Sequence, residues 1–212
     1  EADSLNCAML GESVATDDPE FELFIKEVAR EMTVKAGQKC TAIRRIIVPA
    51  AQLDAVASAL QARLEKTTVG DPGAEGVRMG PLVGRDQARD VRAAVERLAA
   101  ECEVIYGGQE TFPLTGADNS SGAFFPPTLL RCDDPHGKTL VHEVEAFGPV
   151  STLIPYQNTD DAMAIARLGK GSLVGSLFTY DDTEAKNIIL GTAPWHGRML
   201  IINRDCAGES TG

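Results

Sequence analysis

The stretch Gly37-Gln38-Lys39-Cys40-Thr41-Ala42-Ile43-Arg44-Arg45-Ile46-Ile47-Val48-Pro49 joins the end of a helical pattern to an apolar strand. Before it, residues 19–36 repeat large apolar side chains at helical spacing, with Asp17 or Asp18 placed to cap the start and Gly37 placed to end the helix. After it, residues 42–48 form an apolar run that stops at Pro49. A helix followed directly by a buried strand predicts an α/β fold.

The same alternation continues to the end of the chain. Helical spacing recurs in residues 50–66, 85–101, 159–168 and 182–190, and extended runs occupy residues 103–106, 125–131, 148–156, 173–180 and 199–203. Residues 70–84 and 107–122 are rich in glycine and polar residues and are predicted to be loops, and residues 1–18 are a lead with no predicted element. This pattern predicts a three-layer domain, with a largely parallel sheet and helices on both faces.

Composition excludes several classes of protein. The net charge is −11 and the basic residues are scattered, so a nucleic-acid partner, which needs clustered positive charge, is not expected. No apolar run approaches the 18 residues that a membrane helix needs. Five cysteines without a C-x-x-C pair predict neither a disulfide framework nor a zinc site, so no metal site is predicted and a reducing cytoplasm is the expected location.

Cys40 is a candidate nucleophile because it lies at the junction between a helix and a strand. Backbone N–H groups are unpaired at such junctions, and catalytic groups gather on loops. A thiolate attacks carbonyl carbon readily, and the backbone N–H of Cys40 would help to hold the resulting oxyanion. The alternative is that Cys40 is a small buried hydrophobic residue.

Several segments in order along the chain resemble motifs of the aldehyde dehydrogenase superfamily. The first is Gly37-Gln38-Lys39-Cys40, and the others are Val69-Gly70-Asp71-Pro72, Met79-Gly80-Pro81-Leu82, Gly122-Ala123-Phe124-Phe125-Pro126-Pro127-Thr128-Leu129 and Glu145-Ala146-Phe147-Gly148-Pro149-Val150. Within the superfamily, Glu1-Ala2-Asp3-Ser4-Leu5-Asn6 and residues 35–49 are most similar to the bifunctional ring-opening enzymes of bacterial phenylacetate degradation.

This resemblance implies that residues 1–212 are the aldehyde dehydrogenase catalytic domain, excised from a longer protein. No G-x-G-x-x-G fingerprint follows a predicted strand. In the family, the nucleotide-binding domain precedes the segment that begins here, and in the ring-opening branch a hydratase domain accompanies it. The resemblance therefore implies that this piece alone is inactive, and that the full-length protein is a homo-oligomer.

The resemblance also assigns roles to four residues. Cys40 would attack an aldehyde, hydride would pass to NADP, with NAD as an alternative, and water would hydrolyse the resulting thioester. Glu1 matches the family's general base for that hydrolysis. Glu145 matches the carboxylate that binds the nicotinamide ribose, and Phe147 matches the aromatic ring beside the nicotinamide. The implied substrate is a small-molecule aldehyde, specifically the CoA-linked semialdehyde formed on ring opening.

Three alternatives stay open at this stage. The chain is also compatible with an aldehyde dehydrogenase of another substrate class, or with a non-catalytic domain that assembles with other subunits. The third alternative is a thiol hydrolase, in which His136, His142 or His196 would activate Cys40. Cys206 is placed near the end of the chain, where it is either a cleft residue or a small structural residue, and Asn203 is expected to shape the site rather than to react.

Overall fold

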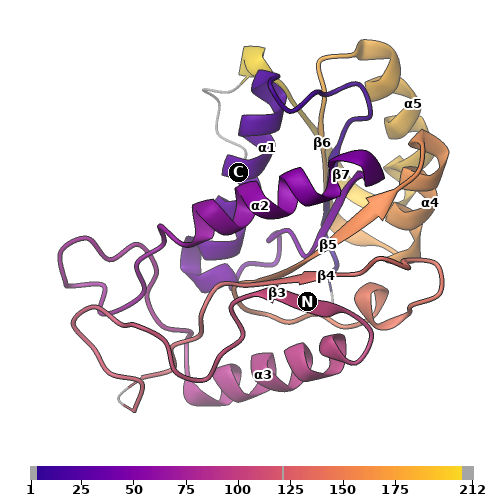
Figure 1. The fold of residues 1–212 in the computed structure, drawn as a ribbon. Coiled ribbons are helices and arrows are strands. Elements are labelled where there is room, and N and C mark those ends of the chain that lie inside the picture. The colour runs from indigo at the N-terminus through magenta and orange to yellow at the C-terminus, as the bar shows by residue number, and fades with distance from the viewer. Residues whose placement is uncertain (1–3, 121, 207–212) are drawn as a thin grey trace.

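A seven-stranded sheet forms the centre of the protein. The structure is a computed structural model that describes residues 4–120 and 122–206. The strands lie in the order β3-β4-β5-β2-β1-β6-β7, and Figure 1 shows the sheet between α1 and α2 on one side and α4 and α5 on the other. Their bounds are β1 (Cys7–Leu10), β2 (Arg45–Pro49), β3 (Glu103–Tyr106), β4 (Thr128–Arg131), β5 (Val150–Tyr156), β6 (Ser172–Phe178) and β7 (His196–Ile202). β3 runs antiparallel to β4, and all the other pairs are parallel.

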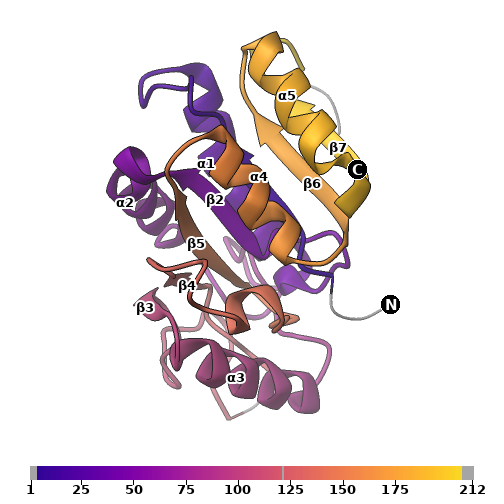
Figure 2. The same ribbon diagram turned by 90° about the vertical axis from the view of Figure 1, so that its right-hand side faces the viewer.

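Helices cover both faces of this sheet. The helices are α1 (Pro19–Thr33), α2 (Leu53–Leu64), α3 (Arg85–Ala99), α4 (Thr159–Leu168) and α5 (Asp182–Thr192). Side chains of α1 and α2 join one hydrophobic cluster, and side chains of α3, α4 and α5 join a second cluster. Figure 2 views the face that α4 and α5 cover. The predicted three-layer, largely parallel α/β fold is therefore confirmed.

The position of β2 in the sheet follows from its sequence. Ile46 and Val48 pack into the cluster with α1 and α2, whereas Ile47 between them packs into the cluster on the opposite face. A strand between two covered faces needs apolar side chains on both sides, so it reads as a continuous run rather than an alternating one. β-branched side chains also suit a buried pleated surface.

Two predictions about local structure were wrong. The lead segment contains β1, a strand near the centre of the sheet that pairs with β2 and β6. Four residues without a β-branched side chain gave too weak a signal for a strand. The helix predicted over residues 19–36 ends at Thr33, because Val34 leaves the helical region and the next residues turn the chain.

The parallel strands bring distant segments together at one edge of the sheet. Asn6 and Arg44 lie directly before β1 and β2, and Gly148 lies two residues before β5. These three strands are neighbours in the order β5-β2-β1, so their amino ends meet. Within the described residues, no helix combines the length and apolar character needed to span a membrane.

Candidate active site

The segment before Cys40 is a tight turn built from left-handed residues. Lys35, Ala36 and Gly37 have φ angles of 53°, 52° and 69°. A Cβ atom on Gly37 would lie 2.2 Å from the carbonyl oxygen of Gly148, so the turn requires glycine at this position. This close approach sets the turn against the loop that precedes β5. Cys40 follows the turn and is exposed.

Asn6 ties the Cys40 backbone to the centre of the sheet. Its Nδ2 group donates to the carbonyl oxygens of Cys40, at 2.8 Å, and Ala42, at 3.0 Å. Its Oδ1 atom accepts from the N–H of Val174 on β6 at 2.9 Å and from the Ser4 hydroxyl at 3.0 Å. Asn6 is 1% exposed, so these bonds form away from water, where losing a partner is costly.

Arg44 connects the turn before Cys40 to Glu145. The guanidinium donates from Nη2 to the Gly37 carbonyl at 2.8 Å, from Nη1 to the Gly148 carbonyl at 2.7 Å and from Nε to Glu145 Oε1 at 3.1 Å. The backbone N–H of Ser4 donates to the other oxygen, Oε2, at 3.2 Å. Burial lowers the pKa of Arg44, and the charge of Glu145 opposes that shift. Both side chains of this ion pair are nearly inaccessible to water, at 3% and 5% exposure.

The two side chains directly before Cys40 are also held in place. The Nζ atom of Lys39 lies 2.9 Å from Oε1 of Glu31 on α1, and Oε1 of Gln38 accepts from the N–H of Val83 at 2.8 Å. The half-buried ring of Phe147 lies under Arg44, with the guanidinium carbon 5.4 Å from the ring centroid, within the range of a cation–π contact.

Three of the four predicted site residues therefore meet at this edge. Glu145 and Phe147 both contact Arg44, whose guanidinium also binds the turn before Cys40. Glu1 lies outside the described residues. Sequence reasoning missed the roles of Asn6 and Arg44, although both lie inside the motifs quoted above.

The histidines make their hydrogen bonds elsewhere. His136 bonds to Asp161 at 2.6 Å, and His142 lies 3.2 Å from an Arg45 nitrogen and 2.8 Å from the Pro135 carbonyl. The third, His196, bonds to Ser172 at 2.7 Å and lies 3.9 Å from the Cys7 sulfur.

Burial of both partners argues against a reactive Cys7–His196 pair. Burial lowers the pKa of His196 to about 4, and it raises the pKa of the Cys7 thiol. The pair is therefore a neutral thiol and a neutral imidazole in the core. This arrangement gives no support to a Cys–His hydrolase.

Cys206 has a local structural role. Its sulfur accepts from the backbone N–H of Asn203 at 3.2 Å, within the short turn that follows β7. The structure therefore favours the interpretation of Cys206 as a small structural residue.

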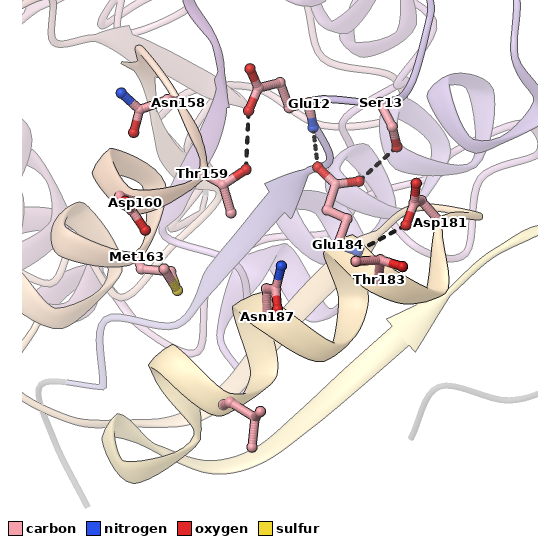
Figure 3. Close-up of a pocket in the computed structure, with 11 residues that line it drawn as sticks. Glu12, Ser13, Asn158, Thr159, Asp160, Met163, Asp181, Thr183, Glu184 and Asn187 are labelled. Atoms are coloured by element: carbon pink, nitrogen blue, oxygen red, sulfur yellow. Dashed lines mark hydrogen bonds between the residues drawn. The ribbon is translucent and has the colours of Figure 1, made fainter.

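A pocket of about 790 Å³ lies at the opposite edge of the sheet, near the carboxyl ends of β1, β5 and β6 (Figure 3). Hydrogen bonds of Glu184 connect segments that line this pocket. The Glu184 carboxylate accepts from the N–H of Glu12 at 2.5 Å, from the Ser13 hydroxyl at 2.7 Å and from the Thr179 hydroxyl at 2.6 Å. These bonds fasten the loop after β1 to the start of α5.

The amino edge offers suitable groups for a nicotinamide cofactor. A carboxylate has about four lone-pair sites, and the hydrogen bonds of Glu145 with Arg44 and Ser4 use two of them. The remaining sites have the chemistry that the hydroxyl groups of a ribose require, although only 5% of the side chain is exposed. The half-buried Phe147 ring offers an aromatic surface that contacts the same guanidinium. In the described ranges there is no cluster of three or more metal-ligating side chains.

Comparison with known proteins agrees with this geometry. The profile of the Aldehyde dehydrogenase family matches residues 6–210. The chain belongs to the aldehyde dehydrogenase family. It is 46% identical over all 212 residues to 3,4-dehydroadipyl-CoA semialdehyde dehydrogenase of Aromatoleum evansii, covering 41% of that protein. It is 47% identical over 135 residues to Protein MaoC of Klebsiella aerogenes, which is 63% of this chain and 38% of that protein.

Solved structures of aldehyde dehydrogenases share the fold. Betaine aldehyde dehydrogenase from Staphylococcus aureus, in complex with NAD+, superposes with a TM-score of 0.79 and 26% identity, over 95% of this chain and 38% of that one. Glyceraldehyde-3-phosphate dehydrogenase from Methanocaldococcus jannaschii, complexed with NADP, gives a TM-score of 0.78 at 21% identity, over 95% and 40% of the two chains. The chain thus spans about two fifths of the length of the curated relative that it matches from end to end.

Proposed function

We propose that the full-length protein oxidises an aldehyde to a carboxylate, with Cys40 as the nucleophile. The observation that carries this proposal is the meeting of three family motifs at one edge of the sheet. Asn6 and Arg44 hold the backbone around an exposed cysteine, and Arg44 also holds the carboxylate of Glu145.

Each residue has a defined part in the proposed reaction. The Cys40 thiolate attacks the aldehyde carbon, and the carbonyl oxygen becomes an oxyanion beside the backbone N–H of Cys40. A bound nicotinamide cofactor supplies the acceptor for the hydride that leaves this carbon. Water then attacks the thioester carbon, Glu1 takes the proton from that water, and the Cys40 thiolate leaves. Glu145 would hold the ribose hydroxyls, and Phe147 would pack beside the nicotinamide.

The proposed substrate is a CoA-linked semialdehyde from aromatic ring opening in phenylacetate degradation. Its support is the name of the Aromatoleum evansii relative and the 46% identity over the whole chain. NADP is the proposed cofactor, on the similarity to the ring-opening branch. NAD is the alternative, since one of the similar solved structures holds NAD+ and another holds NADP.

The remaining parts of the enzyme would lie outside these residues. We propose that residues 1–212 are the catalytic domain and that the nucleotide-binding domain, and in the ring-opening branch a hydratase domain, belong to the rest of a longer protein. The longer protein is proposed to be a homo-oligomer and to lie in the cytoplasm. The short coverage of the curated relative supports this division.

The decisive experiment uses the complete parent gene. Reduction of the nicotinamide cofactor is measured with a simple aldehyde and with a CoA-linked semialdehyde, for the native protein, Cys40→Ala and the matched control Cys206→Ala. We expect activity in the native protein and the control, loss in Cys40→Ala, and preference for the CoA-linked substrate. A folded native protein that oxidises neither aldehyde would favour a non-catalytic domain. Equal rates with both aldehydes would favour another substrate class.

A further inference from the structure

Arg44 is buried at the centre of the candidate site without being the proposed nucleophile or base. Its side chain binds three separate groups: the Gly37 carbonyl before Cys40, the Gly148 carbonyl before β5, and the carboxylate of Glu145. A guanidinium stays charged in proteins and presents its N–H donors in a fixed plane. One rigid cation therefore fixes the relative positions of the nucleophile turn and Glu145.

The contacts to Glu145 also determine which way its carboxylate faces. Arg44 takes Oε1 and the N–H of Ser4 takes Oε2, so both oxygens are held and the carboxylate cannot rotate freely. Burying a carboxylate is costly unless it has such partners. The orientation of the remaining lone pairs is thus set by Arg44 and Ser4, before any ligand arrives.

From this geometry we infer that Arg44 is a positioning residue that holds Glu145 for the cofactor ribose and holds the turn that presents Cys40. The inference rests on the proposed function, because it takes the roles of Cys40 and Glu145 from there. It adds that cofactor affinity and the rate of the chemical step both depend on one guanidinium that touches neither the aldehyde nor the hydride.

The test is a double-mutant cycle in the full-length protein. The variants are Arg44→Lys, Glu145→Gln and the double variant, and Arg131→Lys is the control because Arg131 is an arginine on β4 with exposed acidic partners. Two quantities are measured for each, the dissociation constant of NADP and kcat at saturating cofactor. Lysine keeps the charge of Arg44 but lacks the planar fork that reaches three acceptors.

The expected results separate the contact of Arg44 with Glu145 from its contacts with the carbonyls of Gly37 and Gly148. Arg44→Lys weakens NADP binding by about tenfold or more, the fold-change for one hydrogen bond to a charged group. In the Glu145→Gln background the same change has little further effect on binding, because Arg44 acts on the cofactor through Glu145. It still lowers kcat there, since the contacts to Gly37 and Gly148 are lost. Arg131→Lys changes neither quantity.

Other outcomes have distinct meanings. Additive losses of affinity, an unchanged kcat or wild-type binding in a folded Arg44→Lys protein would each overturn the inference. If Arg44→Lys does not fold, Arg44→Gln takes its place in the cycle. Unfolding of both variants would make Arg44 a purely structural residue and would also overturn the inference. If Glu145→Gln binds NADP normally, or Cys40→Ala stays active, the proposed function fails instead.

Discussion

Replacing Asn6 with leucine tests how the nucleophile loop is held. Leucine has the same branched skeleton of side-chain heavy atoms as asparagine, with somewhat larger methyl groups and no hydrogen-bonding group. The change would remove the bonds to the carbonyls of Cys40 and Ala42 and the bonds from the Val174 N–H and the Ser4 hydroxyl. A hydroxyl can rotate toward another acceptor, unlike a backbone group. The Cys40 carbonyl lies on an exposed residue and can bind water instead, whereas Ala42 and Val174 are buried.

The expected cost follows from those two buried partners. Each buried group left without a partner destabilises a protein by about 1 to 3 kcal/mol, so Asn6→Leu should lower the free energy of unfolding by about 2 to 6 kcal/mol. Asn6→Asp should cost at least as much, because a buried carboxylate would face carbonyl oxygens. In the active full-length protein, kcat should fall as the Cys40 backbone loosens.

Urea unfolding of the 212-residue chain measures the first effect. The matched control is Asn187→Leu, an exposed asparagine on α5, which should change stability by no more than about 0.5 kcal/mol. If Asn6→Leu is as stable as the control, the bonds of Asn6 contribute nothing and the reasoning is refuted. An Asn6→Asp variant more stable than Asn6→Leu would refute the assigned direction of its hydrogen bonds.

Three further predictions concern the core and the turn. Burial lowers the pKa values of His142 and His196 to about 4. Unfolding therefore takes up protons below the ordinary pKa near 6.5, and stability should fall between about pH 6.5 and pH 4 by about 3 kcal/mol per histidine. Urea midpoints across that range measure this loss, and a flat profile contradicts it. Gly37→Ala should destabilise the chain by about 2 kcal/mol or more, because φ is 69° and the new Cβ would meet a carbonyl. Thermal unfolding measures this effect, with Gly84→Ala as the control because the space around a Cβ at Gly84 is open. Equal effects of the two substitutions would be inconsistent with this reasoning. Iodoacetamide should modify Cys40 before the three buried cysteines, which mass mapping checks, and equal labelling would count against its role.

The architecture was predictable because it depends on local patterns. The apolar run of β2 and the amphipathic repeats of α1 and α3 each carry their own signal. β1 carried almost none, since four residues decide its position and its stability comes from strands that are distant in sequence. The end of α1 was also hidden, because two non-glycine residues take left-handed angles that the sequence does not require.

The candidate site was predictable only in part. Cys40, Glu145 and Phe147 were found through the resemblance of their motifs. In the sequence, Arg44 and Asn6 look like ordinary strand and loop residues. Only their burial beside carbonyl oxygens and a carboxylate in the structure reveals their roles. Most of these hydrogen bonds join segments more than 30 positions apart, as in the Asn6–Cys40 contact, so no local pattern reports them.

The position of the site explains why two arginines stand next to each other before the core of β2. Ligands in open α/β sheets usually bind at the carboxyl ends of the strands, where helices begin and positive partial charge gathers. Here that edge carries the pocket of about 790 Å³ and the Glu12–Glu184 contact, and Cys40 lies at the other edge, where covering helices end and present carbonyl oxygens. Arg45 donates to the carbonyls of the last turn of α4, and Arg44 donates to those around the turn. The two guanidinium groups therefore donate to backbone carbonyl oxygens that the end of α4, the turn before Cys40 and the loop before β5 present at this edge, and these carbonyls would otherwise be buried without a partner.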